Sequence, residues 1–392
     1  MTTIKTVTVS ELYRKHTVLA LLALLILTGQ TDCLAQYALE KVNEFKINSL
    51  YTVEIVDYYP RDKLYLGYIN ASEGTRIVLI NGEGDFIANE IVVGEGPNQS
   101  VSAINSMAFA EDGKIWIQTA VQLLLLDQNL VVQKRIRYPS SLKMNIHGRM
   151  EVFPYFYQNE SPSGLSFITN PSGTNSYIFK NDIGNDLIEI YEVREDKLYR
   201  MAPVSHRPLY KNFTASMFSQ LYSLVYTLDR NRRKLYLTNQ FDNEITVYDL
   251  ITGKLASEIK VVHGEFKALK QTPITKEDIP SYGRVSLGAR NHKIFLLDQG
   301  LVVLDYIREI PYGTYEKKIA DDPSYHHFQD PAYHRLILFD GTKQLSEDLS
   351  LPPNGILKTS LPGNRLLMRL VNPDVEEDYI RYGIFKIVET GR

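Results

Sequence analysis

Residues 111–117 read EDGKIWI, and this short stretch decides the fold because similar stretches recur along the chain. Its polar residues are typical of a chain reversal, and the alternating apolar residues that follow are typical of a half-buried β-strand. Further copies are RDKLYL at 61–66, NRRKLYL at 231–237, RNHKIFL at 290–296 and the weaker GNRLLM at 363–368. A module that recurs in this way predicts a repeat architecture.

The spacing of the copies gives the length of the repeat. Lys63 and Lys114 are 51 residues apart, and Lys234 and Lys293 are 59 apart. The gap of 120 between Lys114 and Lys234 holds two repeats of about 60, and a strand-like stretch, LSFIT at 165–169, lies near its midpoint. Five visible copies and one degenerate copy therefore predict six repeats.

A second module follows the first within a repeat. It is an apolar strand that ends in Asp or Asn and a tight turn, as in VLING at 78–82, LLLD at 124–127, VYDLITGK at 247–254 and ILFDG at 337–341. Two hairpins in about 60 residues make a four-stranded sheet. We therefore predict an all-β fold, a six-bladed β-propeller with four-stranded antiparallel blades. A β-sandwich would not repeat paired hairpins at this period, and a β-helix repeat would be much shorter.

The N-terminus predicts export. Basic residues precede a 12-residue apolar run at 17–28, which is too short to span a bilayer but suits the apolar part of a signal peptide. Small residues before Gln36 place cleavage after Ala35, so residues 1–35 are the expected signal peptide and 36–392 a single propeller domain. The mature chain then has no transmembrane span.

Cys33 allows a second interpretation, a lipid anchor. A lipoprotein signal has an aliphatic residue three positions before the cysteine and a small residue directly before it, whereas Gln30 and Asp32 stand there. Ordinary cleavage is therefore favoured. Because Cys33 is the only cysteine, the mature chain would have no disulfide and no thiolate ligand.

One stretch resembles a known family. VVGEGPN at 92–98, followed by a strand and EDGK at 111–114, is similar to the TolB-like six-bladed β-propeller proteins that Gram-negative bacteria export. The likeness is specific only over about 92–127. It implies the fold and export but hardly an activity, because a fold does not fix a function. Residues 94–98 are interpreted as a turn between blades rather than a phosphate loop, since the Lys and Ser or Thr of a P-loop are missing.

The ends of the chain are expected to meet. The last repeat copy is weak, and propellers often complete the final blade with an N-terminal strand. We expect residues Tyr37–Val56 to supply that strand.

No contiguous catalytic motif is present, but one cluster could bind a metal. His326, His327, Asp330 and His334 lie within nine residues, and imidazoles and carboxylates that converge bind Zn²⁺ or another divalent ion. The alternative is a polar connection between strands in which neighbouring histidines point apart. The formal net charge of −3 gives no support to nucleic-acid binding.

Tyr155 and Tyr157 belong to an aromatic stretch, EVFPYFY at 151–157. Aromatic side chains can line a binding funnel, or they can fill the core between blades, and the second interpretation is favoured.

Three classes of function remain, and one of them, a purely structural module of a larger envelope assembly, predicts a large exposed apolar patch and no cluster in the funnel. The first is a binding or scaffold module of the periplasm or cell surface, with an unknown protein or glycan ligand. The second is an enzyme, a hydrolase or lyase acting on a glycan or lactone, with or without a metal. Propeller enzymes take single residues from several blades, so the discriminating observation is whether His, Asp or Glu side chains from different blades meet at the axis.

Overall fold

The computed structural model describes residues 36–139, 142, 150–158, 164–171, 186–208, 224–266, 287–372 and 377–391. The predicted signal peptide, with Cys33, lies outside the described residues. Among the residues it does describe, no helix combines the length and the apolar character needed to cross a membrane.

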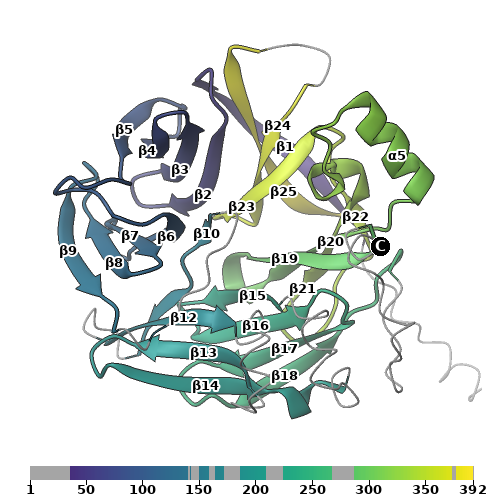
Figure 1. The fold of residues 1–392 in the computed structure, drawn as a ribbon. Helices are drawn as coiled ribbons and strands as arrows, with labels where there is room; N and C mark the ends of the chain where they lie inside the picture. Colours follow the sequence, from purple (N-terminus) through teal and green to yellow (C-terminus); the bar gives the residue numbers. More distant parts are fainter. Residues whose placement is uncertain are drawn as a thin grey trace, which may run out of the picture.

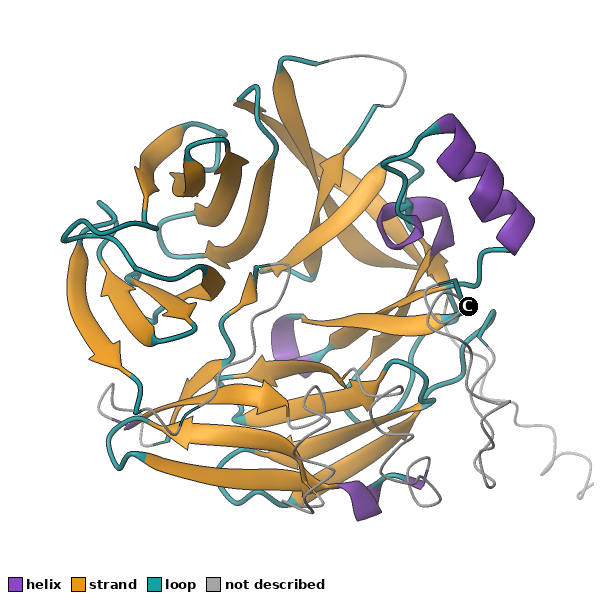
Figure 2. Ribbon diagram, viewed as in Figure 1, coloured by secondary structure: helices purple, strands orange, loops and turns teal. Residues whose placement is uncertain are grey.

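Six small sheets surround a central axis (Figure 1), and strands make up most of the described chain (Figure 2). The predicted six-bladed β-propeller is thereby confirmed.

Blades 1 to 5 follow the chain in order, and the four strands of each run outward from the axis in chain order (Figure 1). Blade 1 contains β2 (Val53–Tyr59), β3 (Leu64–Ala71), β4 (Gly74–Ile80) and β5 (Phe86–Ile91). Blade 2 contains β6 (Ile104–Phe109), β7 (Ile115–Thr119), β8 (Gln122–Leu126) and β9 (Val132–Arg137). Blade 3 contains β11 (Tyr155–Tyr157), β12 (Leu165–Pro171), β13 (Asp186–Glu192) and β14 (Lys197–Pro203). Blade 4 contains β15 (Leu224–Asp229), β16 (Lys234–Asn239), β17 (Glu244–Asp249) and β18 (Leu255–Lys260). Blade 5 contains β19 (Arg290–Leu296), β20 (Val302–Ile307), β21 (His334–Phe339) and β22 (Leu349–Ser350).

Blade 6 joins the two ends of the chain. It contains β23 (Gly355–Leu361), β24 (Arg365–Leu370), β25 (Tyr379–Gly391) and the N-terminal β1 (Gln36–Asn48). β1 pairs with β25 in antiparallel register from Gln36 with Gly391 to Asn48 with Tyr379. The expected closure is confirmed over these residues, but it ends earlier than expected, because the chain from Val53 onward already forms the innermost strand of blade 1.

Blade 2 has one strand more than expected. β10 (Glu151–Val152) pairs in parallel with β6, and the amide of Phe153 donates to the carbonyl of Met107. The chain entering blade 3 therefore passes along the axial edge of blade 2, and β10 lies near the centre of the ring (Figure 1).

The core lies between neighbouring blades. The buried apolar residues of the described chain form six clusters, and each contains residues of two adjacent blades. The cluster between blades 6 and 1, for example, packs Phe45 and Ile47 of β1 with Val53 of β2 and Tyr382 of β25. Closure by β1 thus adds apolar burial as well as backbone pairing.

The recurrent turns share a left-handed backbone conformation at one residue. Lys63, Arg233 and Asn364 precede the second strand of blades 1, 4 and 6, and each has a φ of 54° to 55°. The equivalent residue of blade 2 is Gly113, with φ 82°; glycine has no side chain to strain this left-handed conformation.

Blade 5 departs from the arrangement of the other blades. Residues 290–296 match the first module, whose other copies form β3, β7, β16 and β24, the second strands of their blades, but in blade 5 they form the innermost strand, β19. The turn before the second strand of blade 5 is the 3₁₀ segment Asp298–Gly300. The connection between β20 and β21 carries the 10-residue helix α5 (Tyr312–Asp321) and the 3₁₀ turns His327–Gln329 and Pro331–Tyr333. A further 3₁₀ turn, Val204–His206, follows blade 3.

Candidate ligand-binding cavity

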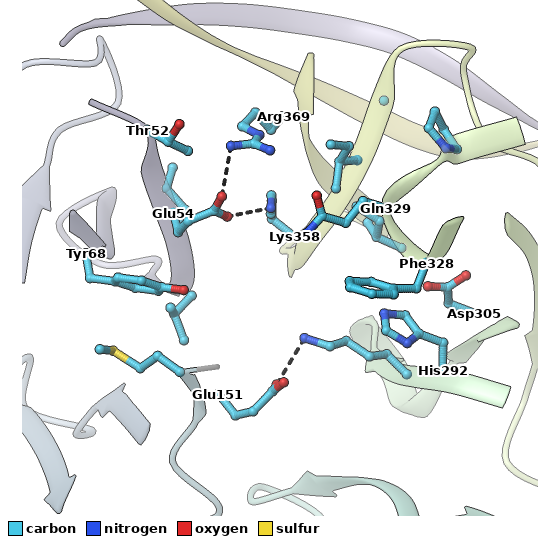
Figure 3. A pocket seen from close by; sticks show the side chains of 18 of the residues that line it. Thr52, Glu54, Tyr68, Glu151, His292, Asp305, Phe328, Gln329, Lys358 and Arg369 are labelled. Carbon is cyan, nitrogen blue, oxygen red and sulfur yellow. Dashed lines mark hydrogen bonds and ion pairs between the residues drawn. The ribbon is translucent and has the colours of Figure 1, made fainter. Parts of the chain in front are cut away.

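A cavity of about 830 Å³ opens at the centre of the ring. Its described walls come from β2 and β3 of blade 1, β10, and strands of blades 5 and 6, together with the segment before β21. Figure 3 shows that charged side chains from separate blades point into this space.

Irregular strand pairing places two of these side chains. The pairing of β23 with β24 shifts register between Leu357 and Thr359, and that of β19 with β20 shifts between Asn291 and Lys293. The skipped residues, Lys358 and His292, both line the cavity. Because a β-bulge re-aims the side chain of the extra residue, the bulges explain how interior strands carry these groups at the axis.

Glu54 joins blade 1 to blade 6. One of its carboxylate oxygens lies 2.5 Å from Nζ of Lys358, and the other accepts a hydrogen bond of 2.8 Å from Nη1 of Arg369 (Figure 3). The exposed fractions of the three side chains are 25% for Glu54, 14% for Lys358 and 15% for Arg369. One carboxylate therefore lies between two largely desolvated cations.

This environment lowers the pKa of Lys358. Burial lowers the pKa of its ammonium group to about 8; Arg369 and Lys293 add to the effect, and Glu54 opposes it. Removing a cation from water and placing it beside further cations disfavours its charged form. A substantial fraction of Lys358 is therefore neutral at mildly alkaline pH.

A second ion pair lies lower in Figure 3. Nζ of Lys293, on β19, lies 3.0 Å from a carboxylate oxygen of Glu151, on β10. Both side chains are more than a third exposed, so water screens this pair and it contributes little to stability. Its groups remain accessible to a ligand.

His334 is held from both sides. Its Nδ1 lies 2.8 Å and 3.0 Å from the carboxylate oxygens of Asp305, and its Nε2 lies 3.0 Å from the carbonyl oxygen of Phe328. Both ring nitrogens face acceptors, which only the protonated imidazole satisfies. Burial lowers the pKa of His334, but the charge and hydrogen bonds of Asp305 outweigh it, so that the pKa is raised overall.

The four predicted metal ligands make separate contacts. His334 contacts Asp305, and Asp330 accepts hydrogen bonds of 2.9 Å from both Lys318 and Tyr325. His327 is buried while its neighbour His326 is exposed, as alternate pointing predicts.

The His326 ring stacks on Phe328. Within the described part of the chain, no group of three His, Cys, Asp or Glu side chains is placed to hold a metal ion. The placement of His326, His327, Asp330 and His334 therefore gives no support to a divalent ion bound by all four.

Tyr155 and Tyr157 are buried between blades 2 and 3, away from the walls of the cavity. The hydroxyl of Tyr155 donates a hydrogen bond of 2.8 Å to the carbonyl of Phe109, and the indole N–H of Trp116 lies 3.5 Å from the hydroxyl of Tyr157. Both aromatic rings contribute to packing between blades.

The residues that do meet at the axis have no common sequence motif. Glu54, Glu151 and His292 come from β2, β10 and β19 and line the same cavity. Acidic and histidine side chains from different blades therefore line one axial cavity, as the enzyme class predicts and the purely structural class does not. The sequence singled out the stretch containing Glu151, but it gave no signal for Glu54 or His292.

No family model and no curated protein matches the chain. Solved structures do match. A member of the DUF4221 family from Bacteroides vulgatus is 10% identical, with a TM-score of 0.65, over 91% of this chain and 99% of that one. A protein from Bacteroides fragilis, described as a candidate exported protein, is 9% identical, with a TM-score of 0.51, over 92% and 96%. At these identities the similarity shows the propeller fold alone.

Proposed function

We propose that this protein is an exported binding module whose axial cavity takes a small polar ligand. The observation that carries the proposal is the convergence of Glu54, Lys358, Arg369, Glu151 and Lys293 on one cavity of about 830 Å³. Cavities of about 300–1,000 Å³ with a few convergent polar groups are typical small-molecule sites. The ring holds these groups on paired strands, so the site is largely pre-formed.

Export is supported by the signal-peptide pattern of residues 1–35 and by the resemblance of residues 92–127 to TolB-like proteins. The structural similarity to a candidate exported protein of Bacteroides fragilis agrees with it. We place the mature chain, residues 36–392, in the periplasm or at the cell surface. Anchoring through a lipid on Cys33 is the less favoured alternative.

The state of the carboxylates favours binding over catalysis. Glu54 lies between two cations, Glu151 is paired with Lys293, and Asp305 with His334. A carboxylate beside a cation tends to remain ionised, whereas a general acid must hold a proton at working pH. Each of the three carboxylates is paired with a cationic or histidine side chain, which favours a binding role over that of a general acid.

One observation favours an enzyme as second candidate. The pKa of Lys358 is lowered to about 8, which suits a general base, and Lys358 faces a cavity that could admit a glycan or lactone. A hydrolase or lyase would then use Lys358 as the base. Steady turnover of a lactone or glycoside by the purified protein, lost in Lys358→Met, would favour this alternative.

The test of binding is a ligand screen on residues 36–392, read by thermal melting and calorimetry. The panel contains neutral and acidic mono- and disaccharides. A ligand at about 100 times its dissociation constant adds about 2.7 kcal/mol, so a hit raises the melting temperature measurably. We expect Lys358→Met to reduce the shift by about half or more, and Lys260→Met, an exposed site on the outermost strand of blade 4, to keep it. Ligands that bind both variants equally well would place binding elsewhere and refute the proposal.

A further inference from the structure

We propose that the cavity ligand is a small hydroxylated carboxylate, such as a sugar acid, whose carboxylate is held by Lys358 and Arg369. This inference rests on the proposed binding function and names the chemical class of its ligand.

Charge at one wall is the first argument. Lys358 and Arg369 share the single carboxylate of Glu54, so this group of three has one positive charge in excess. Both cationic side chains are about 15% exposed, and leaving a cation in such a place without a full counter-charge is unfavourable. A ligand carboxylate would supply the missing negative charge.

The hydrogen-bond state of Arg369 is the second argument. Its Nη1 donates to Glu54, but its Nε is buried and has no hydrogen-bond partner among the described residues. An unsatisfied buried donor is rare in proteins and calls for a partner that completes it. The planar guanidinium group of arginine can donate two parallel hydrogen bonds to one carboxylate. After a small rotation, the guanidinium of Arg369 could donate hydrogen bonds to both Glu54 and a ligand carboxylate.

The geometry of blade 6 brings the two cations together. Arg369 pairs across the sheet with Ile356, two residues before Lys358, and the bulge at Lys358 turns that side chain to the same cavity. A ligand carboxylate that enters from the cavity beside Glu54 would receive charge-assisted hydrogen bonds from both cations.

The remaining walls favour a hydroxylated body. Thr52, Tyr68 and Gln329 surround the charged groups (Figure 3), and each offers polar atoms that hydrogen-bond hydroxyl groups. Tyr68 and Phe328 lie on opposite sides of the cavity and present aromatic rings, which pack against the apolar face of a sugar ring. A sugar acid combines both requirements.

The inference has a pH signature. A carboxylate ligand favours the charged form of Lys358, whose pKa in the free protein is about 8. Binding should therefore take up protons near pH 8, and affinity should fall as the pH rises above that value, by up to about tenfold per pH unit. A neutral ligand has no such dependence.

Calorimetry on residues 36–392 tests the inference with matched pairs: glucuronate with glucose, galacturonate with galactose, and gluconate with sorbitol. Inorganic phosphate serves as a general anion. We expect at least one acid to bind about tenfold more tightly than its neutral partner and than phosphate. Lys358→Met and, separately, Arg369→Gln should each weaken binding of that acid about tenfold or more. Lys358→Met should also remove the affinity change between pH 7 and pH 9, while Lys260→Met retains both affinity and pH dependence.

Each other outcome is decisive. A neutral sugar that binds as tightly as its acid overturns the inference but leaves the binding function standing. Phosphate that binds as tightly as the best acid replaces the carboxylate site with a general anion site. If no member of either set binds at about 10 mM, above the dissociation constants expected even of weak ligands, the inference and the binding function both fall. Melting curves of the variants without ligand establish that each is folded.

Discussion

Two arginines form ion pairs with carboxylates, one in the wall of the ring and one at its axis. Arg207 follows blade 3 and is fully buried. Its Nε donates to Asp242 at 2.9 Å, and its Nη1 donates to Thr246 at 2.8 Å and to the carbonyl of Leu237 at 3.1 Å. Arg369, at the axis, donates to Glu54 but leaves its Nε without a described partner.

The difference separates structural from functional charge. A buried guanidinium is tolerated when the protein satisfies its donors, and Arg207 meets that condition with groups of blade 4 alone. Arg369, in contrast, lines a cavity and has an Nε donor without a hydrogen-bond partner among the described residues. We infer that the wall network holds the blades together, whereas the axial network is completed by a ligand.

The largest expected effect comes from removing β1, which closes the wall. Deleting residues 36–48 takes Phe45 and Ile47 out of the core between blades 6 and 1 and leaves β25 unpaired on one side. Burial of these two side chains alone is worth roughly 3–6 kcal/mol, comparable to the stability of many domains. We expect the cooperative melt of residues 49–392 to be lost or strongly lowered.

Point substitutions provide the control for this deletion. Phe45→Ala should reproduce a large part of the loss, whereas Val42→Ala, at a position 46% exposed on the same strand, should melt almost like the wild type. An unchanged melt after the deletion would show that closure by β1 does not stabilise the ring.

The next effect tests the two arginines directly. Arg207→Met leaves Asp242 as a buried charge without its partner and should cost about 3–5 kcal/mol in denaturant unfolding. Arg369→Met leaves Glu54 paired with Lys358, so no charge loses its only partner, and it should cost clearly less than Arg207→Met. The double variant Arg207→Met/Asp242→Leu should recover part of the first loss, because no charge is then stranded. If the two single variants lose equal free energy of unfolding, the buried arginine in the wall and the arginine at the axis do not differ in their structural role.

The fold could be predicted because its signals are local and repeated. The turn before the second strand recurs at Lys63, Gly113 and Arg233 with the same left-handed backbone, and each copy reinforces the others. Blade 5 breaks this pattern, because RNHKIFL at 290–296 matches the module in sequence but forms the innermost strand. Helix α5 and the short β10 were missed because neither repeats.

The site could not be predicted in the same way. Glu54, Lys358 and Arg369 are each unremarkable in sequence and meet only because blade closure brings residue 54 beside residue 358. The bulges that aim His292 and Lys358 inward depend on strand pairing, which sequence spacing does not show. The histidine cluster did draw notice to one residue of the cavity, His334, but its partner is Asp305 on the neighbouring strand.

The smallest effect concerns two histidines whose environments act in opposite directions on stability. Burial lowers the pKa of His327 to about 4, helped by Arg290 and His334 and opposed by Asp330. A histidine held neutral stabilises the fold above its unfolded pKa of about 6.5, and that contribution is lost as pH falls toward 4.

His334, whose pKa is raised by Asp305, stabilises the fold below that unfolded value and loses its contribution as pH rises through its folded pKa.

Melting curves from pH 4 to pH 8 separate the two contributions. His327→Phe should reduce the acid loss of stability below pH 6.5 by about 1–3 kcal/mol, since a phenyl ring fills the buried site and binds no proton. His334→Asn should instead lose stability mainly at acidic pH, so that its difference from the wild type shrinks as pH rises. Both variants leave the Glu54–Lys358–Arg369 group intact. If the melting temperatures of the two variants change with pH in the same way, burial does not control the protonation of His327 and pairing with Asp305 does not control that of His334.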